Sequence, residues 1–464
     1  MTERNSRAIA YTVAAAFFME MLDASIITTA LPTIGAAFGT SALGVSASVT
    51  VYLVAMAIFV PAAGWCGERY GARRAFATAV GVFTFASLLC GLASSLWMLI
   101  AARFLQGAAA AFMSPVGRFV VLRETPQHRI IEGIATITWP GLIAPVLGPP
   151  LGGFIVSHVS WHWIFLINVP LGLIGVWLVL RYIPHRAPTR RAGFDTPGFV
   201  LTALSLAALV EGLSELGKSQ GDRAWPLVLI VTGVVAGIAA VRHARRAKDP
   251  MLDLRALSVP TYALAIAGVG FTSRVAINAS PFLLPLMFQI GFGMPPTQAG
   301  WMVLVYMVGN LTMKSATTWV LHRFGFRRVL IVNGALCVMT LVACGLLAPG
   351  LPMPLIYAVL LIAGMTRSMN FTTVNTLAFA DVKPEQRAGA TALATMFQQV
   401  AMTLGVAFAA FALGASQTLR AASALDLADF RNVWFAVAVL MTAACAGAFR
   451  LDPAAGATIS GKRS

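Results

Sequence analysis

Long apolar stretches alternate with short clusters of charged residues along the whole chain. No Asp, Glu, Lys or Arg lies between Asp23 and Glu68, and further uncharged stretches cover residues 133–180, 275–313 and 329–366. A helix that crosses a bilayer needs about 20 predominantly apolar residues, so each stretch has room for two such helices or most of two. The pattern predicts an all-α polytopic membrane protein, because the short alternating segments of a membrane β-barrel are absent.

Glycine and proline breaks, together with the charged clusters, divide the chain into fourteen predicted membrane spans. The spans cover residues 8–31, 45–63, 75–93, 97–122, 133–157, 164–180, 195–216, 225–241, 261–290, 299–321, 329–347, 353–379, 388–413 and 433–449. Basic residues gather in the loops of one side, and the loops of the other side hold only Lys218, Arg223, Arg420 and Arg431. Because basic loops face the cytoplasm, we expect both termini to be cytoplasmic.

The composition supports a membrane protein and gives no sign of an enzyme. Hydrophobic residues make up 58% of the 464 positions and charged residues 11%, against about 25% charged residues in average soluble domains. The formal net charge of +16 is explained by the basic loops, and no nucleic-acid-binding motif accompanies it. The five cysteines lie in apolar stretches without CxxC spacing. Neither a phosphate-binding loop nor a cluster of metal ligands is present, so we expect no enzyme activity and no cofactor.

The sequence R-x-G-x-R-R occurs twice, at residues 69–74 and 323–328. Eight predicted spans separate the two copies, whereas two six-helix halves would place them six spans apart. Two additional helices between the halves explain the difference. The predicted organisation is therefore a six-helix bundle over residues 1–183, two additional helices over 184–255, and a second six-helix bundle with a short cytoplasmic tail over 256–464.

Four motifs are spread over the N-terminal half. They are L-D-x-S-I-I-x-T-A-L-P at 22–32, G-x3-E-R-x-G-x-R-R at 64–74, R-F-L-Q-G at 103–107 and G-P-P-L-G-G at 148–153, and the run W-H-W-I-F-L-I-N-V-P follows at 161–170. In this order and spacing they resemble the fourteen-helix drug:proton antiporter branch of the major facilitator superfamily. Thr28, Ala144 and His162 depart from the Asn, Gly and Arg that are usual there. The resemblance covers nearly the whole chain and implies two bundles that alternate access to a central cavity.

Glu20 and Asp23 are the candidates for proton coupling. They lie three residues apart in the first span and share one helical face. Burial and mutual repulsion both oppose double ionisation, so the pair can exchange protons, although the motif of the branch contains Asp23 and not Glu20. Arg103 lies at a matching depth, about 10 Å below the outer surface at 1.5 Å per residue. An ion pair with Asp23 would couple protonation to helix movement, unless it is a static structural pair.

Two glycine-containing segments are candidates for conformational gating. We expect the loop at residues 64–74 to act as a charge clasp in which Glu68 and Arg69 tie the second and third spans to a neighbouring helix end, a role that the resemblance supports. The gating candidates in this loop are Gly64, Glu68, Arg69, Gly71, Arg73 and Arg74. Its alternative role is a positive-inside anchor. In the fifth span, Gly148, Pro149, Gly152 and Gly153 permit close helix packing and local bending. We expect them to form a pliable seam against a helix of the other half.

Basic and amide side chains inside the spans are candidates for the substrate cavity. Arg274 and Arg367 lie near the middle of predicted helices, which is costly unless they face a cavity or a partner. Arg118 and Lys314 either line the same cavity or extend to the cytoplasmic surface. The amides either bind substrate or join helices; they are Asn278, Asn370, Asn375 and Gln398. A basic cavity would suit an anionic or zwitterionic substrate.

The sequence thus predicts a proton-coupled secondary transporter that exports small molecules, of the drug or multidrug efflux type, in a bacterial inner membrane. The alternative is a proton-coupled exporter of organic anions or metabolites. A channel or membrane receptor fits less well, since it would need neither the loop repeat nor an intramembrane carboxylate–arginine pair. The expected partners are a small-molecule substrate, protons and the lipid bilayer, with the proton gradient as the energy source, and we expect a monomer that binds no nucleic acid.

Overall fold

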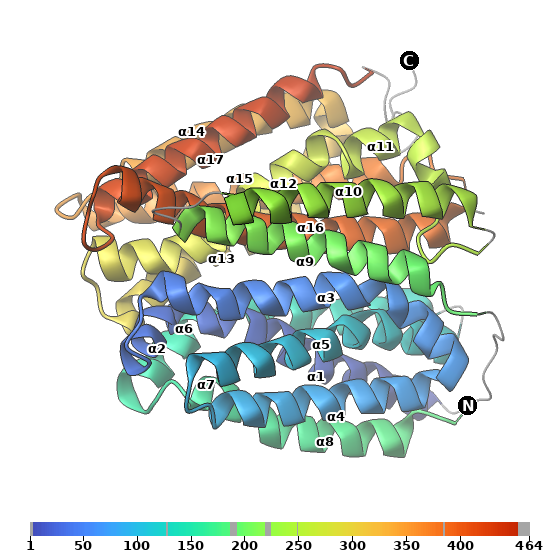
Figure 1. The fold of residues 1–464 in the computed structure, drawn as a ribbon. Helices are drawn as coiled ribbons and strands as arrows, with labels where there is room; N and C mark the ends of the chain where they lie inside the picture. Colours follow the sequence, from blue (N-terminus) through green and yellow to red (C-terminus); the bar gives the residue numbers. More distant parts are fainter. Residues whose placement is uncertain are drawn as a thin grey trace. The chain divides into compact units, whose positions relative to one another are not determined.

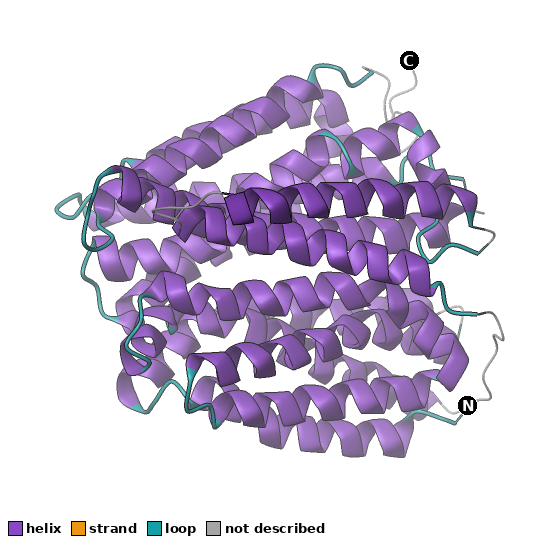
Figure 2. Cartoon of the chain, viewed as in Figure 1, coloured by secondary structure: helices purple, strands orange, loops and turns teal. Residues whose placement is uncertain are grey.

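The computed structural model describes residues 3–126, 129–185, 193–218, 224–247, 249–383 and 386–452. These ranges consist of helices and connecting loops and contain no strand (Figure 2). Thirteen of the described helices are long and apolar enough to cross a membrane. Helix α13 (Pro296–Phe324) contains the remaining predicted span and is 29 residues long, and it carries Asn310, Lys314 and several threonines. The all-α membrane architecture is confirmed, and a count of fourteen spans agrees with these helices.

The chain divides into two compact units, residues 1–203 with 295–300 and residues 204–294 with 301–464 (Figure 1). The boundaries predicted at 183/184 and 255/256 stay predictions. The basic residues Arg186, Arg190, Arg191 and Lys248 lie outside the described residues.

The first unit is built from long helices and two short connecting ones. Its elements are α1 (Glu3–Ile26), the 3-10 turn η1 (Ile27–Thr29), α2 (Leu31–Ala37), α3 (Ala42–Tyr70), α4 (Ala72–Gly91), α5 (Leu96–Glu124), α6 (Ile130–His158), α7 (Trp163–Leu166), α8 (Asn168–Tyr182) and the start of α9 (Thr196–Lys218). Side-chain caps fix two of the starts: the Ser41 hydroxyl accepts from the Gly44 amide of α3, and the Ser95 hydroxyl accepts from the Met98 amide of α5, each at 3.2 Å. Helix α5 contacts both α3 and α4, and α1 contacts α6.

The second unit contains the rest of α9 and the helices that follow it. They are α10 (Ala224–Arg246), the 3-10 turn η3 (Leu254–Ser258), α11 (Pro260–Ile266), α12 (Val269–Leu286), the π-turn η4 (Met287–Gly291), α13, α14 (Phe326–Gly345), α15 (Met353–Ala378), α16 (Arg387–Leu419) and α17 (Leu427–Ala448). Helices α9 and α10 lie where the two additional helices are predicted. They pack closely, since the Ser205 hydroxyl donates to the Gly233 carbonyl at 2.8 Å.

Two predicted spans are interrupted in the structure. The first span ends as a regular helix at Ile26, passes through η1 and resumes in α2, where Pro32 occupies the first turn. The ninth span is broken at Gly268, whose ψ of −120° is not helical, and it ends in the π-turn η4. Such irregularities inside membrane helices are often functional, and both lie in helices that carry candidate site residues.

Candidate coupling and substrate sites

Asp23 lies in the last turn of α1, and its carboxylate accepts three hydrogen bonds from two other helices. Arg103 Nη1 of α5 donates to Oδ2 at 2.6 Å, Gln106 Nε2 of α5 donates to Oδ1 at 2.9 Å, and Asn168 Nδ2 of α8 donates to Oδ1 at 2.8 Å. Asp23 is 1% exposed, and its three donors are fully buried. The ion pair expected from the matched depths of Asp23 and Arg103 is thus present, and it joins α1, α5 and α8.

The arginine of this network is held by further contacts. Arg103 Nη1 also donates to Gln106 Oε1 at 2.6 Å, and Gln106 Nε2 donates to Ser87 Oγ of α4 at 2.7 Å. The guanidinium carbon of Arg103 lies 4.1 Å from the ring centroid of Tyr52 on α3, a favourable cation–π geometry. A Cβ on Gly107 would lie 2.2 Å from the Tyr52 carbonyl oxygen. Only glycine therefore lets α5 approach α3 closely enough for this stacking.

Four residues of the network had no role in our sequence-based prediction. Gln106 and Asn168 belong to the motifs at residues 103–107 and 161–170, so a signal for them was present in the sequence. Ser87 and Tyr52 lie in no motif, and only the packing of α3, α4 and α5 places them next to Arg103.

Glu20 lies one turn before Asp23 but has a different partner. The Ser114 hydroxyl of α5 lies 3.1 Å from Glu20 Oε1 and 2.8 Å from Oε2. Glu20 is 1% exposed. Arg118, one turn further along α5, is exposed, and it lies near enough to interact electrostatically with Glu20. The two carboxylates of α1 thus differ: Asp23 has an arginine in direct contact, whereas the described contact of Glu20 is to a neutral hydroxyl.

The two copies of the R-x-G-x-R-R repeat make equivalent contacts. Gly71 separates α3 from α4 with φ 86°, and Gly325 separates α13 from α14 with φ 78°, a region that favours glycine. Two residues later, Arg73 Nη2 donates to the Leu180 carbonyl near the end of α8, and Arg327 Nη2 donates to the Phe449 carbonyl just after α17. The tie to a neighbouring helix end therefore comes from the first arginine after the glycine.

The other candidates in the loop at residues 64–74 lie around this tie. Gly64, Arg69 and Arg74 are exposed, and Glu68 is half-buried. Arg74 borders an apolar pocket that Phe59 and Cys66 also line.

The glycines of α6 make closer contacts with α1 than we expected. A Cβ on Gly148 would lie 1.9 Å from Ser25 Oγ, and one on Gly152 would lie 2.5 Å from Thr29 Oγ1. The predicted partner in the other half is thus wrong for these two glycines, because the small residues serve to bring α6 against the helix that carries Asp23. Gly153 faces the Pro296 carbonyl, with a distance of 2.3 Å from a built Cβ. Residues 295–300 group with the first unit.

The candidate substrate residues of the second unit are partly brought together. Arg274 Nη2 of α12 donates to Asn375 Oδ1 of α15 at 2.6 Å, and Arg367 Nη2 of α15 donates to Asn278 Oδ1 of α12 at 3.3 Å. Asn370 is buried on α15, three residues after Arg367. Lys314 of α13 and Gln398 of α16 are half-buried. Arg118 belongs to the first unit and lies near Glu20 instead.

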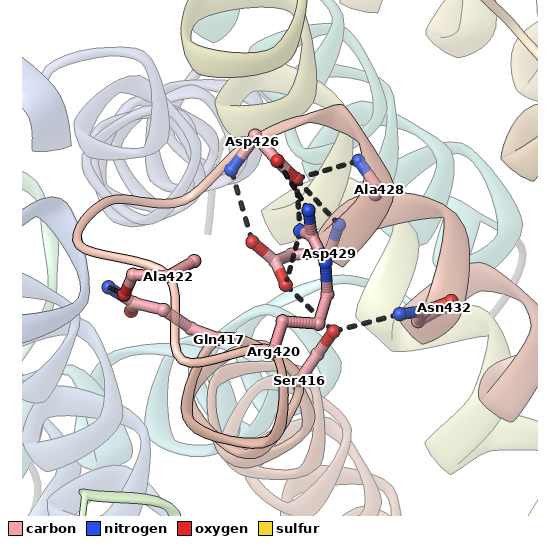
Figure 3. Close-up of polar contacts among 8 residues, drawn as sticks. All are labelled: Ser416, Gln417, Arg420, Ala422, Asp426, Ala428, Asp429 and Asn432. Atoms are coloured by element: carbon pink, nitrogen blue, oxygen red, sulfur yellow. Dashed lines mark hydrogen bonds and ion pairs between the residues drawn. The ribbon is translucent and has the colours of Figure 1, made fainter.

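A second polar cluster joins α16 to α17 (Figure 3). The fully buried Asp429 accepts from Ser416 Oγ at 2.8 Å and pairs with Arg420 Nη1 at 3.1 Å. Asp426 caps α17 and forms a bidentate pair with Arg420. The Arg420 guanidinium lowers the pKa of the Asp426 carboxyl to about 2. Asn432 Nδ2 donates to Ser416 Oγ at 3.0 Å. These contacts fix the loop between α16 and α17 to both helices, which indicates that the cluster has a structural role.

The fold and the buried ion network define a polytopic membrane protein of the secondary-transporter type. A sequence model described as Major Facilitator Superfamily matches residues 13–406 and 266–464. The chain belongs to this family. Among the described residues, no group of His, Cys, Asp and Glu side chains is arranged to hold a metal ion.

Similar proteins agree with this family. The chain is 36% identical over 444 residues to a protein named multidrug resistance protein MdtD of Salmonella paratyphi A, which covers 94% of this chain and 93% of that protein. A bacterial homologue of the human lysosomal transporter Spinster, in an inward-facing and unoccupied conformation, superposes with a TM-score of 0.66 at 15% identity and full coverage of both chains. The xylose transporter XylE of E. coli gives a TM-score of 0.62 at 14% identity, with coverage of 97% and 99%. These two structures show the fold alone.

Proposed function

We propose that the chain is a proton-coupled exporter of small, drug-like molecules in a bacterial inner membrane, acting as a monomer with both termini cytoplasmic. The observation that carries this proposal is the buried ion pair between Asp23 of α1 and Arg103 of α5. The multidrug resistance name of a relative that covers nearly the whole chain supports export of drug-like compounds.

Protonation of Asp23 is the proposed coupling step. The ionised carboxylate holds donors from α5 and α8 at once. A proton on Asp23 removes its negative charge and leaves Arg103 buried without a counter-ion. Removing one partner of a buried ion pair costs about 3–5 kcal/mol, so the protonated network favours a different arrangement of these helices. Proton occupancy thereby biases the conformation of the first unit.

Glu20 has a different proposed role, because its partner can adapt to either protonation state. A serine hydroxyl donates to an ionised carboxylate and can accept from a protonated one. The Ser114 contact can therefore persist through protonation without breaking an ion pair. We assign Glu20 to tuning of the pH dependence and Asp23 to the coupling itself.

The two arginine ties are the proposed conformational clasps. Arg73 and Arg327 each donate to a carbonyl at the end of the last long helix of their six-helix set. A cation at a helix C-terminus is favourable because the helix dipole is negative there. These ties can hold the cytoplasmic ends of the helices in one state and release them in the other.

Transport by Asp23→Asn in proteoliposomes tests the proposal. The purified protein is reconstituted with an imposed pH gradient, and movement of the fluorescent cation ethidium and of a panel of organic anions is followed. We expect pH-driven accumulation by the parent and none by Asp23→Asn, while Glu20→Gln shifts the pH profile with a smaller loss. Asp253→Asn is the matched control, because Asp253 pairs with the exposed Arg255 in a loop. Full pH-driven transport by Asp23→Asn would place the coupling proton elsewhere.

A further inference from the structure

We propose that the exported compound carries an oxyanion, a carboxylate or phosphate group, that binds to Arg274 and Arg367 between α12 and α15. This inference rests on the proposed export function and names the chemical class of its substrate.

The basic residues of α12, α13 and α15 have no acidic residue in their own stretch of the sequence. Residues 254–380 contain no Asp or Glu at all, although Arg274, Lys314 and Arg367 lie among them. Asp429 is the acidic residue in the spans that follow, and it is already bound to Arg420 and Ser416. The intramembrane positive charges of α12, α13 and α15 therefore have no carboxylate on their own helices.

Neutral amides occupy the places where counter-ions would be expected. Arg274 is fully buried and has Asn375 Oδ1 as its partner, while its Nε and Nη1 have no hydrogen-bond partner. Arg367 has Asn278 Oδ1 as its partner, and its Nε is likewise buried without one. Each amide oxygen accepts one hydrogen bond and brings no charge. Three guanidinium nitrogens on α12 and α15 thus have no hydrogen-bond acceptor.

The buried arginine of the first unit shows the arrangement that is missing here. Arg103 is as buried as Arg274, and Asp23 Oδ2 lies 2.6 Å from its Nη1. An uncompensated buried charge is strongly destabilising, and charged residues inside a membrane mark sites of function by default. A ligand that supplies the negative charge explains Arg274 and Arg367. The planar guanidinium is suited to carboxylate and phosphate groups, which it can bind through two parallel hydrogen bonds.

The groups around Arg367 suit a small organic anion, but the pocket beside it measures about 10 Å³ in this conformation, room for about one water, so an anion must bind in a more open conformation. Arg367 borders a small pocket whose other lining includes Ile277, Ser280, Tyr306, Thr340 and Trp434. The pocket combines hydroxyl groups with aromatic and aliphatic surface, as small-molecule sites do. Lys314 lies near enough to interact electrostatically with Arg367 and adds a third positive charge.

Ligand-induced stabilisation tests the proposal without any pH gradient. The full-length protein in neutral detergent is unfolded thermally with increasing succinate or inorganic phosphate, with tetraphenylphosphonium as the cationic comparison. We expect the anions to raise the unfolding midpoint of the parent protein. Arg274→Gln and Arg367→Gln should weaken the apparent affinity at least about tenfold, because each loses a charge-assisted hydrogen bond. Arg255→Gln is the control, since its side chain is 83% exposed and paired with Asp253.

A second variant separates loss of binding from loss of folding. Asn375→Asp places a carboxylate where the amide oxygen now lies 2.6 Å from Arg274 Nη2. We expect a higher midpoint without ligand and a smaller shift with succinate or phosphate, because the new carboxylate competes for the same donors. An anion shift that survives undiminished in Asn375→Asp and in both arginine variants would overturn the proposal.

Lipid headgroups carry the same oxyanion chemistry, so the membrane must be tested as its source. The measurement is repeated in nanodiscs of phosphatidylcholine with and without phosphatidylglycerol. Stabilisation by phosphatidylglycerol alone, with no response to succinate or phosphate, would assign the arginines to lipid and refute the substrate proposal. If the protein exports ethidium in response to a pH gradient but no anion stabilises it, the anionic substrate is refuted and the proposed export function stands.

Discussion

The ion pair between Asp23 and Arg103 allows a quantitative prediction for stability. Both side chains are 0% exposed, and the atoms Asp23 Oδ2 and Arg103 Nη1 are 2.6 Å apart, so solvent screening does not weaken the pair. Asp23→Asn leaves the guanidinium charge without a counter-ion, and Arg103→Gln leaves the carboxylate without one. Each single change should lower the free energy of unfolding by about 3–5 kcal/mol.

The double variant Asp23→Asn, Arg103→Gln removes both charges and leaves two amides in reach of each other. We expect it to recover part of the loss, with a coupling energy of about 2–3 kcal/mol, at the upper end of the range for residues in direct contact. The assay is unfolding in detergent at pH 7, followed by circular dichroism and by a fluorescent reporter of cysteine exposure. Pairing the two probes checks that unfolding is a single transition.

Strict additivity of the two single changes would refute the assignment of a tight buried pair. The assignment would also be refuted if each single variant changed the free energy of unfolding by less than about 0.5 kcal/mol, as substitutions at exposed surface positions usually do. Either result would mean that Arg103 and Asp23 are hydrated separately, and coupling by loss of their contact would have no energetic basis.

Two further predictions concern packing and pH. Gly107→Ala should lower the free energy of unfolding by about 1–3 kcal/mol and impair transport, because its Cβ would meet the Tyr52 carbonyl. The control is Gly193→Ala, whose added Cβ meets nothing within 4 Å, and it should leave both thermal unfolding and dye transport unchanged. Asp426→Asn should lower the unfolding midpoint slightly at pH 7 but not near pH 2. The pKa of Asp426 is lowered to about 2 in the folded protein. Its carboxylate therefore contributes to stability above about pH 4, and this contribution is lost as the pH falls through 2. An equal effect at both pH values would show that the Arg420 pair adds nothing.

The sequence predicted the architecture well because the bilayer imposes strong rules on composition. Uncharged stretches of about 20 residues and the bias of basic loops follow from the cost of charge in lipid, so most helices could be located without a structure. The repeat at Gly71 and Gly325 could also be found, because a positive φ at the same place in both copies requires the same residue.

The breaks within spans could not be predicted in the same way. The interruption at Gly268 depends on how α11 and α12 pack, and an isolated glycine in an apolar run does not reveal it. The partner of Gly148 and Gly152 was likewise misassigned, because small residues at helical spacing indicate that a helix comes close without saying which helix it is.

The site residues, too, fall into those that could be predicted from the sequence and those that could not. Asp23, Arg103 and Arg274 could be singled out because a charge inside a span is conspicuous in the sequence. Ser87 and Tyr52 could not, since serine and tyrosine are common in membrane helices and only their contacts with Gln106 and Arg103 give them a role. Charged residues and the amides Asn278 and Asn375 were therefore predictable, and the hydroxyl and aromatic partners Ser87 and Tyr52 were not.

The distribution of charge also bears on how proton and substrate are coupled. The intramembrane carboxylates Glu20 and Asp23 belong to the first unit, and the arginines without carboxylate partners, Arg274 and Arg367, belong to the second. If the proposed roles hold, proton and substrate bind to different groups and do not compete for a single site. Coupling then requires that each ligand favours a different conformation, and such linkage is reciprocal. Succinate binding, measured over a pH range in which both of its carboxylates stay ionised, should therefore depend on pH in the parent protein and lose that dependence in Asp23→Asn, whereas Arg274→Gln should weaken binding at every pH.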